Sequence, residues 1–286
     1  MTGWTDGHWR SNDGIRLHYR DYPGRSDRPA ILCIPGLTRN ARDFAEVAER
    51  LAGEWRIICV DLRGRGESGY AQDPLSYVPP VYLQDLQTLL ADLALVRVVA
   101  FGTSLGGLMA MLLAAADRDL LVGALLNDIG PVIEAEGMAH IASYVGRQQS
   151  WPTWLHAARH FQSLHGASFP RYRLPDWIAL AKRLCRLTPA GRIVLDYDMK
   201  IAEPFRQVDP VAIDLWPAFD MLATVPLLIV RGGLSNLFSV ATADAMVARA
   251  ADAELLTIAD TGHAPTLTED GCPPAIDRLL GRIIGG

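Results

Sequence analysis

Two kinds of hydrophobic pattern alternate along the chain. Runs that are apolar at every position, bounded by turn residues, are typical of parallel strands covered on both faces. Amphipathic stretches with helical spacing lie between them. The apolar runs predict strands at residues 30–34, 55–60, 98–101, 121–126, 226–230 and 254–258. The amphipathic stretches predict helices at residues 41–52, 81–93, 240–250 and 274–284, and a further apolar helix follows Ser104. The pattern predicts an α/β fold with a mostly parallel central sheet and helices on both of its faces.

Two parts of the chain depart from this alternation of strands and helices. Residues 8–21 alternate between apolar and polar side chains around Asn12-Asp13-Gly14, which predicts an antiparallel hairpin at one edge of the sheet. From residue 131 to residue 216 no apolar run of the strand type appears, and helix-like segments rich in tryptophan and histidine are broken by proline. We therefore expect a core of residues 1–130 and 217–286, with residues 131–216 inserted as a helical cap.

The sequence Gly102-Thr103-Ser104-Leu105-Gly106 stands between a predicted strand and a predicted helix. This is the nucleophile-elbow pattern, in which a serine on a tight strand-to-helix turn projects above the sheet. Glycines are needed two residues before and after it because larger side chains would collide there. The alternative is that Ser104 only caps the following helix.

A serine hydroxyl is a poor nucleophile at neutral pH, so Ser104 needs a base. Among the histidines, His263 alone follows a predicted core strand at its carboxyl end, where catalytic groups gather in open α/β sheets. The oxyanion of an acyl-transfer reaction needs two backbone N–H groups. We assign these to Leu105, directly after the serine, and to Leu37, in the loop after the strand at residues 30–34.

Taken together, these motifs resemble those of the α/β-hydrolase family over essentially the whole chain. The resemblance rests on four segments: Pro35-Gly36-Leu37, Asp61-Leu62-Arg63-Gly64-Arg65-Gly66-Glu67-Ser68, Gly102 to Gly107, and Gly262-His263. The family usually has His-Gly where this chain has Pro35-Gly36. The departure leaves the oxyanion site in place because its donor is a backbone amide.

The acid that would orient His263 has two candidate positions. In similar family members it often follows the strand that here ends at Val230, but this chain has Ser235 and Asn236 there, which carry no charge. Asp128 stands one strand earlier, and some haloalkane dehalogenases resemble that arrangement. We predict Asp128 as the acid and keep Asn236 as an uncharged alternative third member.

The resemblance implies a serine hydrolase that acts on an ester, lactone or related acyl bond of a small, partly apolar substrate. Hydrolysis of a carbon–carbon bond, as in aromatic degradation, and a non-hydrolytic ligand-binding role remain alternatives. A carboxylate-nucleophile hydrolase is disfavoured because position 104 is serine. Four tryptophans are candidates to line the substrate pocket, although such residues more often form the core of a subdomain. Arg39 and Asn40 are candidates to meet a polar substrate group, and the alternative for them is a solvated face. These tryptophans are Trp151, Trp154, Trp177 and Trp216.

Composition narrows the function further. The 286 residues carry a net charge of −5 with no basic cluster, which argues against a nucleic-acid partner. No apolar run is long enough to cross a membrane, and no signal peptide is expected, so we predict a cytoplasmic protein. The four cysteines are scattered without metal-site spacing, so we predict no metal. We also predict no cofactor, because the Gly-x-Gly-x-x-Gly match at residues 64–69 does not open a helix as a dinucleotide fingerprint would.

Overall fold

The computed structural model describes residues 3–204 and 214–285. Its main sheet has eight strands in the order β1-β2-β4-β3-β5-β6-β10-β11. The strands are β1 (Thr5–Arg10), β2 (Arg16–Tyr22), β3 (Ala30–Ile34), β4 (Ile57–Asp61), β5 (Val98–Thr103), β6 (Leu121–Asn127), β10 (Leu227–Gly232) and β11 (Ala253–Ile258). β1 and β2 form the predicted antiparallel hairpin, β2 pairs antiparallel with β4, and the neighbours from β4 to β11 are parallel. The predicted α/β class is confirmed.

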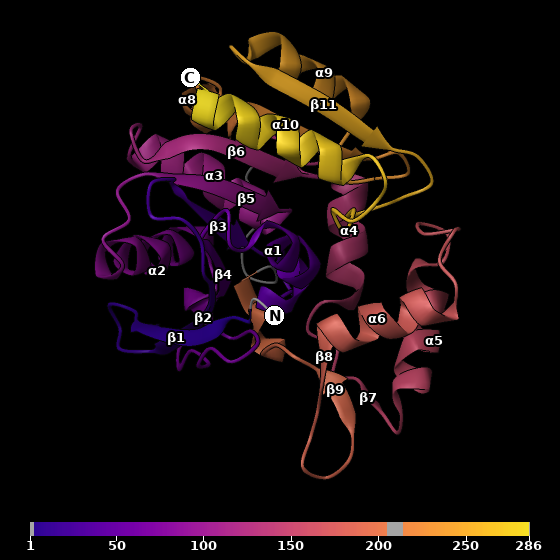
Figure 1. Cartoon of the computed structure of the whole chain (residues 1–286). Coiled ribbons are helices and arrows are strands. Elements are labelled where there is room, and N and C mark those ends of the chain that lie inside the picture. Colours follow the sequence, from indigo (N-terminus) through magenta and orange to yellow (C-terminus); the bar gives the residue numbers. More distant parts are fainter. Residues whose placement is uncertain (1–2, 205–213, 286) are drawn as a thin grey trace.

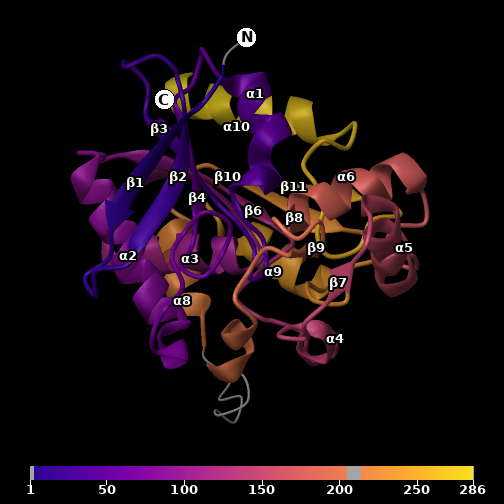
Figure 2. The same ribbon diagram turned by 90° about the horizontal axis from the view of Figure 1, so that it is seen from below.

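Alternate residues of the central strands bury two separate apolar layers. In β3, Ile31 and Cys33 face the layer that contains α1 and α10, whereas Leu32 and Ile34 face the layer that contains α2, α3 and α8. Figure 2 shows these two groups of helices on opposite sides of the strands. The helices are α1 (Ala45–Leu51), α2 (Pro79–Asp92), α3 (Leu105–Ala116), α8 (Trp216–Leu222), α9 (Val240–Arg249) and α10 (Cys272–Gly285), with short 3-10 helices η1 (Ala41–Phe44) and η2 (Pro74–Ser76). Burial on both faces is why these strands are apolar throughout.

The segment between β6 and α8 forms a separate group of elements beside the carboxyl ends of the strands (Figure 1). It contains α4 (Ala135–Tyr144), α5 (Trp154–His165), α6 (Leu174–Leu184) and η3 (Met199–Ala202), together with the strands β7 (Ser150–Trp151), β8 (Cys185–Leu187) and β9 (Ile193–Leu195). The three strands pair antiparallel in the order β7-β9-β8, so the insertion contains a small sheet in addition to the expected helices. Strands of two or three residues are too short to show an alternating pattern.

This inserted segment has its own apolar core and is also hydrogen-bonded to the main sheet domain. Its core includes Trp177 and other buried side chains of α5 and α6. The amide of Asp198 donates to the carbonyl of Gly64 at 2.7 Å, and the amide of Gly262 donates to the carbonyl of Ser168 at 2.6 Å. Both links lie beside loops that follow core strands. The boundaries at residues 130/131 and 216/217 stay predictions, and residues 205–213 of the predicted cap lie outside the described part of the chain.

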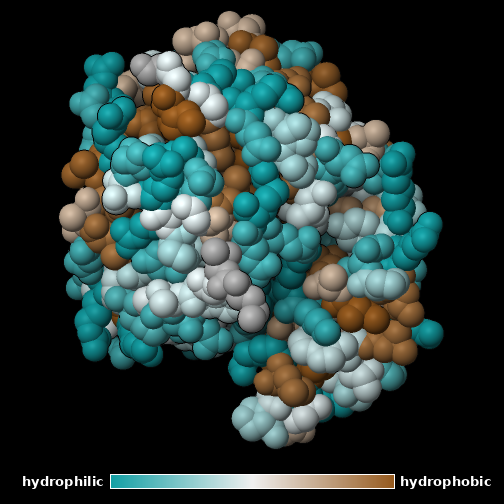
Figure 3. Space-filling view, viewed as in Figure 1, coloured by the Kyte–Doolittle hydropathy of each residue, from teal (hydrophilic) through white to brown (hydrophobic). Residues whose placement is uncertain are grey.

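The surface in Figure 3 is mostly hydrophilic, with apolar residues in small groups. Among the residues that the structure describes, no helix combines the length and the apolar character needed to span a bilayer. All four cysteines are buried and unpaired, as expected for structural thiols.

Candidate active site

Ser104 lies at the sharp turn between β5 and α3. Its backbone has φ 52° and ψ −116°, a conformation that costs a non-glycine residue of order 1–3 kcal/mol. The turn is held by the amide of Ser104, which donates to the carbonyl of Asn127 on β6 at 2.9 Å. The Ser104 side chain makes no capping hydrogen bond to α3. Helix capping therefore does not explain this serine, and its hydroxyl is free to interact elsewhere.

The two flanking glycines are required by close backbone contacts. A Cβ placed on Gly102 would lie 2.4 Å from the backbone carbon of Gly106. A Cβ placed on Gly106 would lie 1.8 Å from the carbonyl oxygen of Ile34 on β3. Neither neighbour is a flexible side-chain end, so the spacing read from the sequence is a steric requirement of this turn.

We expect Gly102→Ala to lower the free energy of unfolding by about 3 kcal/mol, the upper range for forced overpacking, because the added methyl group meets rigid backbone. Gly281→Ala is the matched control. Gly281 lies in α10 with open space around it, so alanine there should raise stability by about 0.5–1 kcal/mol. Denaturant unfolding of both variants checks this, and an unchanged midpoint for Gly102→Ala would contradict the steric argument.

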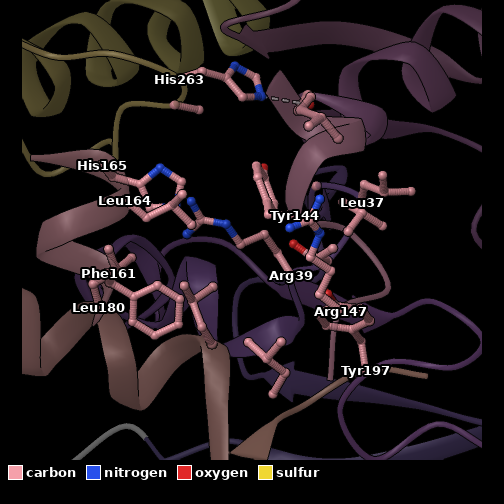
Figure 4. A pocket seen from close by; sticks show the side chains of 18 of the residues that line it. Leu37, Arg39, Tyr144, Arg147, Phe161, Leu164, His165, Leu180, Tyr197 and His263 are labelled. Carbon is pink, nitrogen blue, oxygen red and sulfur yellow. Dashed lines mark hydrogen bonds between the residues drawn. The ribbon is translucent and has the colours of Figure 1, made fainter. Parts of the chain in front are cut away.

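His263 and Asp128 continue a hydrogen-bonded series that begins at Ser104. His263 Nε2 lies 2.9 Å from Ser104 Oγ (Figure 4), and His263 Nδ1 lies 2.7 Å from Asp128 Oδ2. The Asp128 carboxylate is fully buried and is compensated by two further donors. The amide of Gly232 donates to Oδ1 at 2.7 Å, and the hydroxyl of Ser235 donates to Oδ2 at 2.6 Å. A buried carboxylate is tolerated when its oxygens are paired in this way.

Asn236, the alternative third member, is not brought to the imidazole. Its side chain makes no hydrogen bond within the described residues, whereas Asp128 occupies the Nδ1 side of His263. Sequence reasoning missed the part that Ser235 plays. Ser235 stands in the loop after β10 where similar proteins often carry the acid, and its hydroxyl supports Asp128 from there. The sequence signal was the absence of an acidic residue from that loop, which indicated Asp128, after β6, as the acid.

The turn after β3 carries the amide of Leu37 and lies close to Ser104, since a Cβ placed on Gly36 would be 3.6 Å from Cβ of Ser104. The amide of Arg39 donates to the carbonyl of Gly36 at 3.0 Å and closes the turn. The buried Arg65 donates from Nε to the carbonyl of Leu37 at 2.8 Å and so holds the next peptide of this turn. Among the described residues, neither the amide of Leu37 nor that of Leu105 donates a hydrogen bond. Two free N–H groups thus remain near the serine, on preorganised backbone.

The loop at residues 61–68 is a structural support and leads into no helix of the dinucleotide-binding kind. The buried carboxylate of Asp61 accepts hydrogen bonds from the amides of Ala41 at 2.6 Å and Glu67 at 3.0 Å. Its Oδ2 also lies 2.7 Å from Nδ1 of His18, which β2 contributes. The next helical element is η2, which begins at Pro74. The loop ties β2, β4 and η1 together beneath the turn that carries Leu37.

Ser104 and His263 open into a cavity of about 310 Å³. The core contributes the turn from Gly36 to Arg39, residues 103–104 and residues 263–264, and the inserted segment contributes the other lining residues (Figure 4). The apolar lining of the cavity consists of Leu37, Ile141, Val145, Phe161, Leu164, Phe169, Leu180, Leu184, Leu195 and Ala264. This volume lies at the lower end of the range for small-molecule sites, so it suits a compact substrate.

The two histidines that line the cavity from α5 have lowered pKa values. Burial, together with the positive charge of the nearby Arg39, lowers the pKa of His165 to about 4. Burial also lowers the pKa of His160. Above about pH 5 the imidazole of His165 therefore adds no positive charge to the cavity.

The structure places the four tryptophan candidates in apolar cores, the alternative to a place in the pocket lining. None of Trp151, Trp154, Trp177 and Trp216 lines the cavity. Trp151 and Trp177 are buried in the core of the inserted segment, with Trp154 packed against it, and Trp216 packs at the edge of the main core. Of the two polar candidates, Arg39 lines the cavity. Asn40 instead is buried, accepts a hydrogen bond from the amide of Arg42, and donates to the carbonyl of Arg183.

In the part of the chain that the structure describes, no group of three or more His, Cys, Asp or Glu side chains could hold a metal ion.

Comparisons with known proteins show to which family the chain belongs. The model of a family described as "Alpha/beta hydrolase family" matches residues 31–272. The 3-hydroxybutyrate-oligomer hydrolase of Cupriavidus necator is 35% identical over 262 residues, which cover 89% of each chain. The crystal structure of an alpha/beta hydrolase from Novosphingobium aromaticivorans is 50% identical, covers 99% of each chain and superposes with a TM-score of 0.95. The structure of E-2-(acetamidomethylene)succinate hydrolase, 23% identical over 99% of this chain and all of the other, has the same fold with a TM-score of 0.78. The chain therefore belongs to the α/β hydrolase family.

Proposed function

We propose that this protein is a serine hydrolase that cleaves small carboxylic esters, with Ser104 as the nucleophile, His263 as the base and Asp128 as the acid that orients it. The observation that carries this proposal is the series Ser104 Oγ, His263 Nε2, His263 Nδ1 and Asp128 Oδ2, joined at 2.9 and 2.7 Å on the wall of a cavity. Such a series lets a neutral imidazole take the serine proton while a buried carboxylate stabilises the resulting imidazolium.

The reaction runs in two halves. Ser104 Oγ attacks the ester carbonyl as His263 Nε2 accepts its proton, and the same nitrogen then protonates the departing alcohol. Water next attacks the acyl group on Ser104, with His263 again as the base, and the acid product leaves. In both halves the negative charge on the carbonyl oxygen is stabilised by the amides of Leu37 and Leu105, a contribution of about 2.7–4 kcal/mol for each donor.

The relative from Cupriavidus necator supports an oligoester as the first substrate to test. Oligomers of 3-hydroxybutyrate, named in that protein's description, are joined by ester bonds, and the match covers 89% of this chain. The cavity of about 310 Å³ and its largely apolar walls suit a short aliphatic acyl group of this kind.

The inserted segment serves as a cap over this site. It supplies Tyr144, Phe161, His165 and Leu180 to the cavity, opposite the serine and histidine of the core. Excluding water from the cavity strengthens the electrostatic interactions on which the reaction depends.

A burst experiment tests the proposal. Rapid mixing with p-nitrophenyl butyrate should release p-nitrophenol in a burst of about one equivalent per protein, because the acyl-enzyme forms faster than it hydrolyses. A fluorophosphonate probe should add to Ser104, as seen by mass spectrometry of the peptide. The absence of both would favour the non-hydrolytic alternative. Faster turnover of a vinylogous 1,5-diketone than of any ester would favour the carbon–carbon bond hydrolase.

A further inference from the structure

The charge inside the cavity has one sign. Its lining includes two arginines, Arg39 and Arg147, and no aspartate or glutamate among the described residues. The imidazole of His165 is neutral at ordinary pH, so the net positive charge comes from the two guanidinium groups. The whole protein has a net charge of −5, so the positive charge of the cavity beside the candidate nucleophile is opposite in sign to the net charge of the chain.

Arg39 lies next to the reacting serine. A point one bond from Gly36, where a Cβ would stand, is 3.4 Å from Cγ of Arg39 and 3.6 Å from Cβ of Ser104. The side chains of Arg39 and Ser104 therefore both begin close to Gly36. Figure 4 shows the Arg39 side chain extending from there across the cavity toward the side of His165.

The guanidinium of Arg39 has unused donors. Its one ion pair joins Nη1 to Oδ1 of Asp43 at 3.1 Å, and only 21% of its side chain is exposed. Within the described residues, Nε and Nη2 donate no hydrogen bond. A guanidinium presents five N–H donors in a planar fork, so most of its capacity to bind a carboxylate is free.

Arg147 reaches the cavity from the inserted segment, just after α4. Its amide donates to the carbonyl of Tyr144, which sets the chain direction at this point. Among the described residues its side chain forms no ion pair, and Figure 4 shows it among the lining residues on the Leu37 side of the cavity. Arg39 and Arg147 thus come from the core and from the inserted segment to the same space.

From this arrangement we infer that the substrate is an ester that also carries a free carboxylate, which Arg39 and Arg147 bind while the ester carbonyl lies at Ser104. The inference rests on the proposed ester hydrolysis and names its substrate class. A carboxylate suits this pair because it can accept two parallel hydrogen bonds from one guanidinium. The carboxylate can belong to the acyl part of the ester or to its alcohol part, and the experiment separates the two.

Two pairs of substrates differ only in this charge. For the alcohol side, the linear dimer of 3-hydroxybutyric acid is compared with its methyl ester. For the acyl side, the p-nitrophenyl monoester of glutaric acid is compared with its methylated form. In at least one pair, wild-type kcat/KM should favour the free acid by about 10–100-fold, the range for hydrogen bonds to a charged group, mainly through KM. Glutarate should also inhibit hydrolysis of p-nitrophenyl butyrate competitively.

The variants Arg39→Gln and Arg147→Gln should each reduce the acid-to-methyl-ester ratio by about tenfold and weaken inhibition by glutarate. Arg118→Gln is the control for the change in net charge. Arg118 is exposed in the loop before β6, at the opposite end of that strand from Asp128, and the ratio should not change. Because Arg147 is exposed, its variant keeps the test decisive even where Arg39→Gln fails to fold.

The outcomes separate this inference from the proposed function. Wild-type protein that hydrolyses p-nitrophenyl butyrate but shows a ratio near one in both pairs would overturn the carboxylate subsite and leave the esterase intact. A strong wild-type preference that both variants retain would also overturn it. Absence of any ester hydrolysis would instead overturn the proposed function.

Discussion

Ser104→Ala is expected to lower kcat/KM for p-nitrophenyl butyrate by about 10⁵–10⁶-fold, the scale seen when a serine nucleophile is removed from a hydrogen-bonded unit. In the proposed mechanism the variant lacks the atom that forms the acyl-enzyme, whereas His263 and the two free amides remain. It should therefore show no burst of p-nitrophenol and no fluorophosphonate adduct at residue 104. Steady-state and rapid-mixing kinetics measure the first two effects, and mass spectrometry measures the third.

The fold should survive this change, so the loss can be assigned to chemistry. Alanine at φ 52° carries the same backbone strain as the serine it replaces, and only one hydrogen bond, to His263, is lost. We expect the free energy of unfolding to change by about 1 kcal/mol or less. Ser163→Ala is the matched control, since Ser163 lies on α5 outside the cavity lining and bonds only to the carbonyl of His160. Activity of Ser104→Ala above about 1% of wild type would show that another group is the nucleophile.

The strands and their order around the serine could be predicted because each constraint is local. A parallel strand buried on both faces must be apolar throughout, and β3, β5 and β6 meet this requirement within one to two residues of the predicted bounds. The glycines at 102 and 106 reflect backbone contacts inside one turn. Such features depend on residues that are close together in the sequence, so they can be predicted from the sequence directly.

The third member of the series could not be decided in the same way. Asp128 and Asn236 both follow buried strands, and the choice depends on where β6 and β10 place their loops relative to His263. β6 and β10 are neighbours in the sheet, so the loops that follow them meet. This pairing lets Ser235 support Asp128 from the loop in which a carboxylate was sought. The contact between Ser235 and Asp128 joins residues 107 positions apart, and no pattern in a single sequence reveals such a contact.

The lining of the cavity was the least accessible part of the site. Trp177 sits at helical spacing on α6, but periodicity shows only that a helix has an apolar face and leaves open what that face contacts. In the structure that face packs on α5, within the inserted segment. The charged lining residue Arg147 lies in a connecting stretch without periodicity, and its approach to Arg39 depends on how the inserted segment lies against the core.

Asp128→Asn provides the second large expected effect, a fall in kcat of about 10⁴-fold with the fold intact. The residue has φ 56°, a region that asparagine adopts almost as readily as aspartate, so the backbone accepts the change. Oδ1 accepts a hydrogen bond from the amide of Gly232, so the asparagine oxygen should remain there and its NH₂ group should face His263. That group donates to Nδ1 and places the imidazole proton on Nε2, where the ring can no longer accept the proton of Ser104.

The comparison with Asn236→Ala makes this prediction specific to one position. Asn236 makes no side-chain hydrogen bond in the described part of the chain, so its replacement should change kcat by less than about twofold, as is usual for surface substitutions. Both variants should unfold within a few degrees of the wild type. The opposite pattern, an active Asp128→Asn and an inactive Asn236→Ala, would transfer the orienting role to the loop after β10. Equal and small effects of both changes would contradict the proposed role of Asp128. We expect a large effect at Asp128 because its fully buried carboxylate lies 2.7 Å from Nδ1 of His263, where its charge would stabilise the imidazolium of the proposed mechanism.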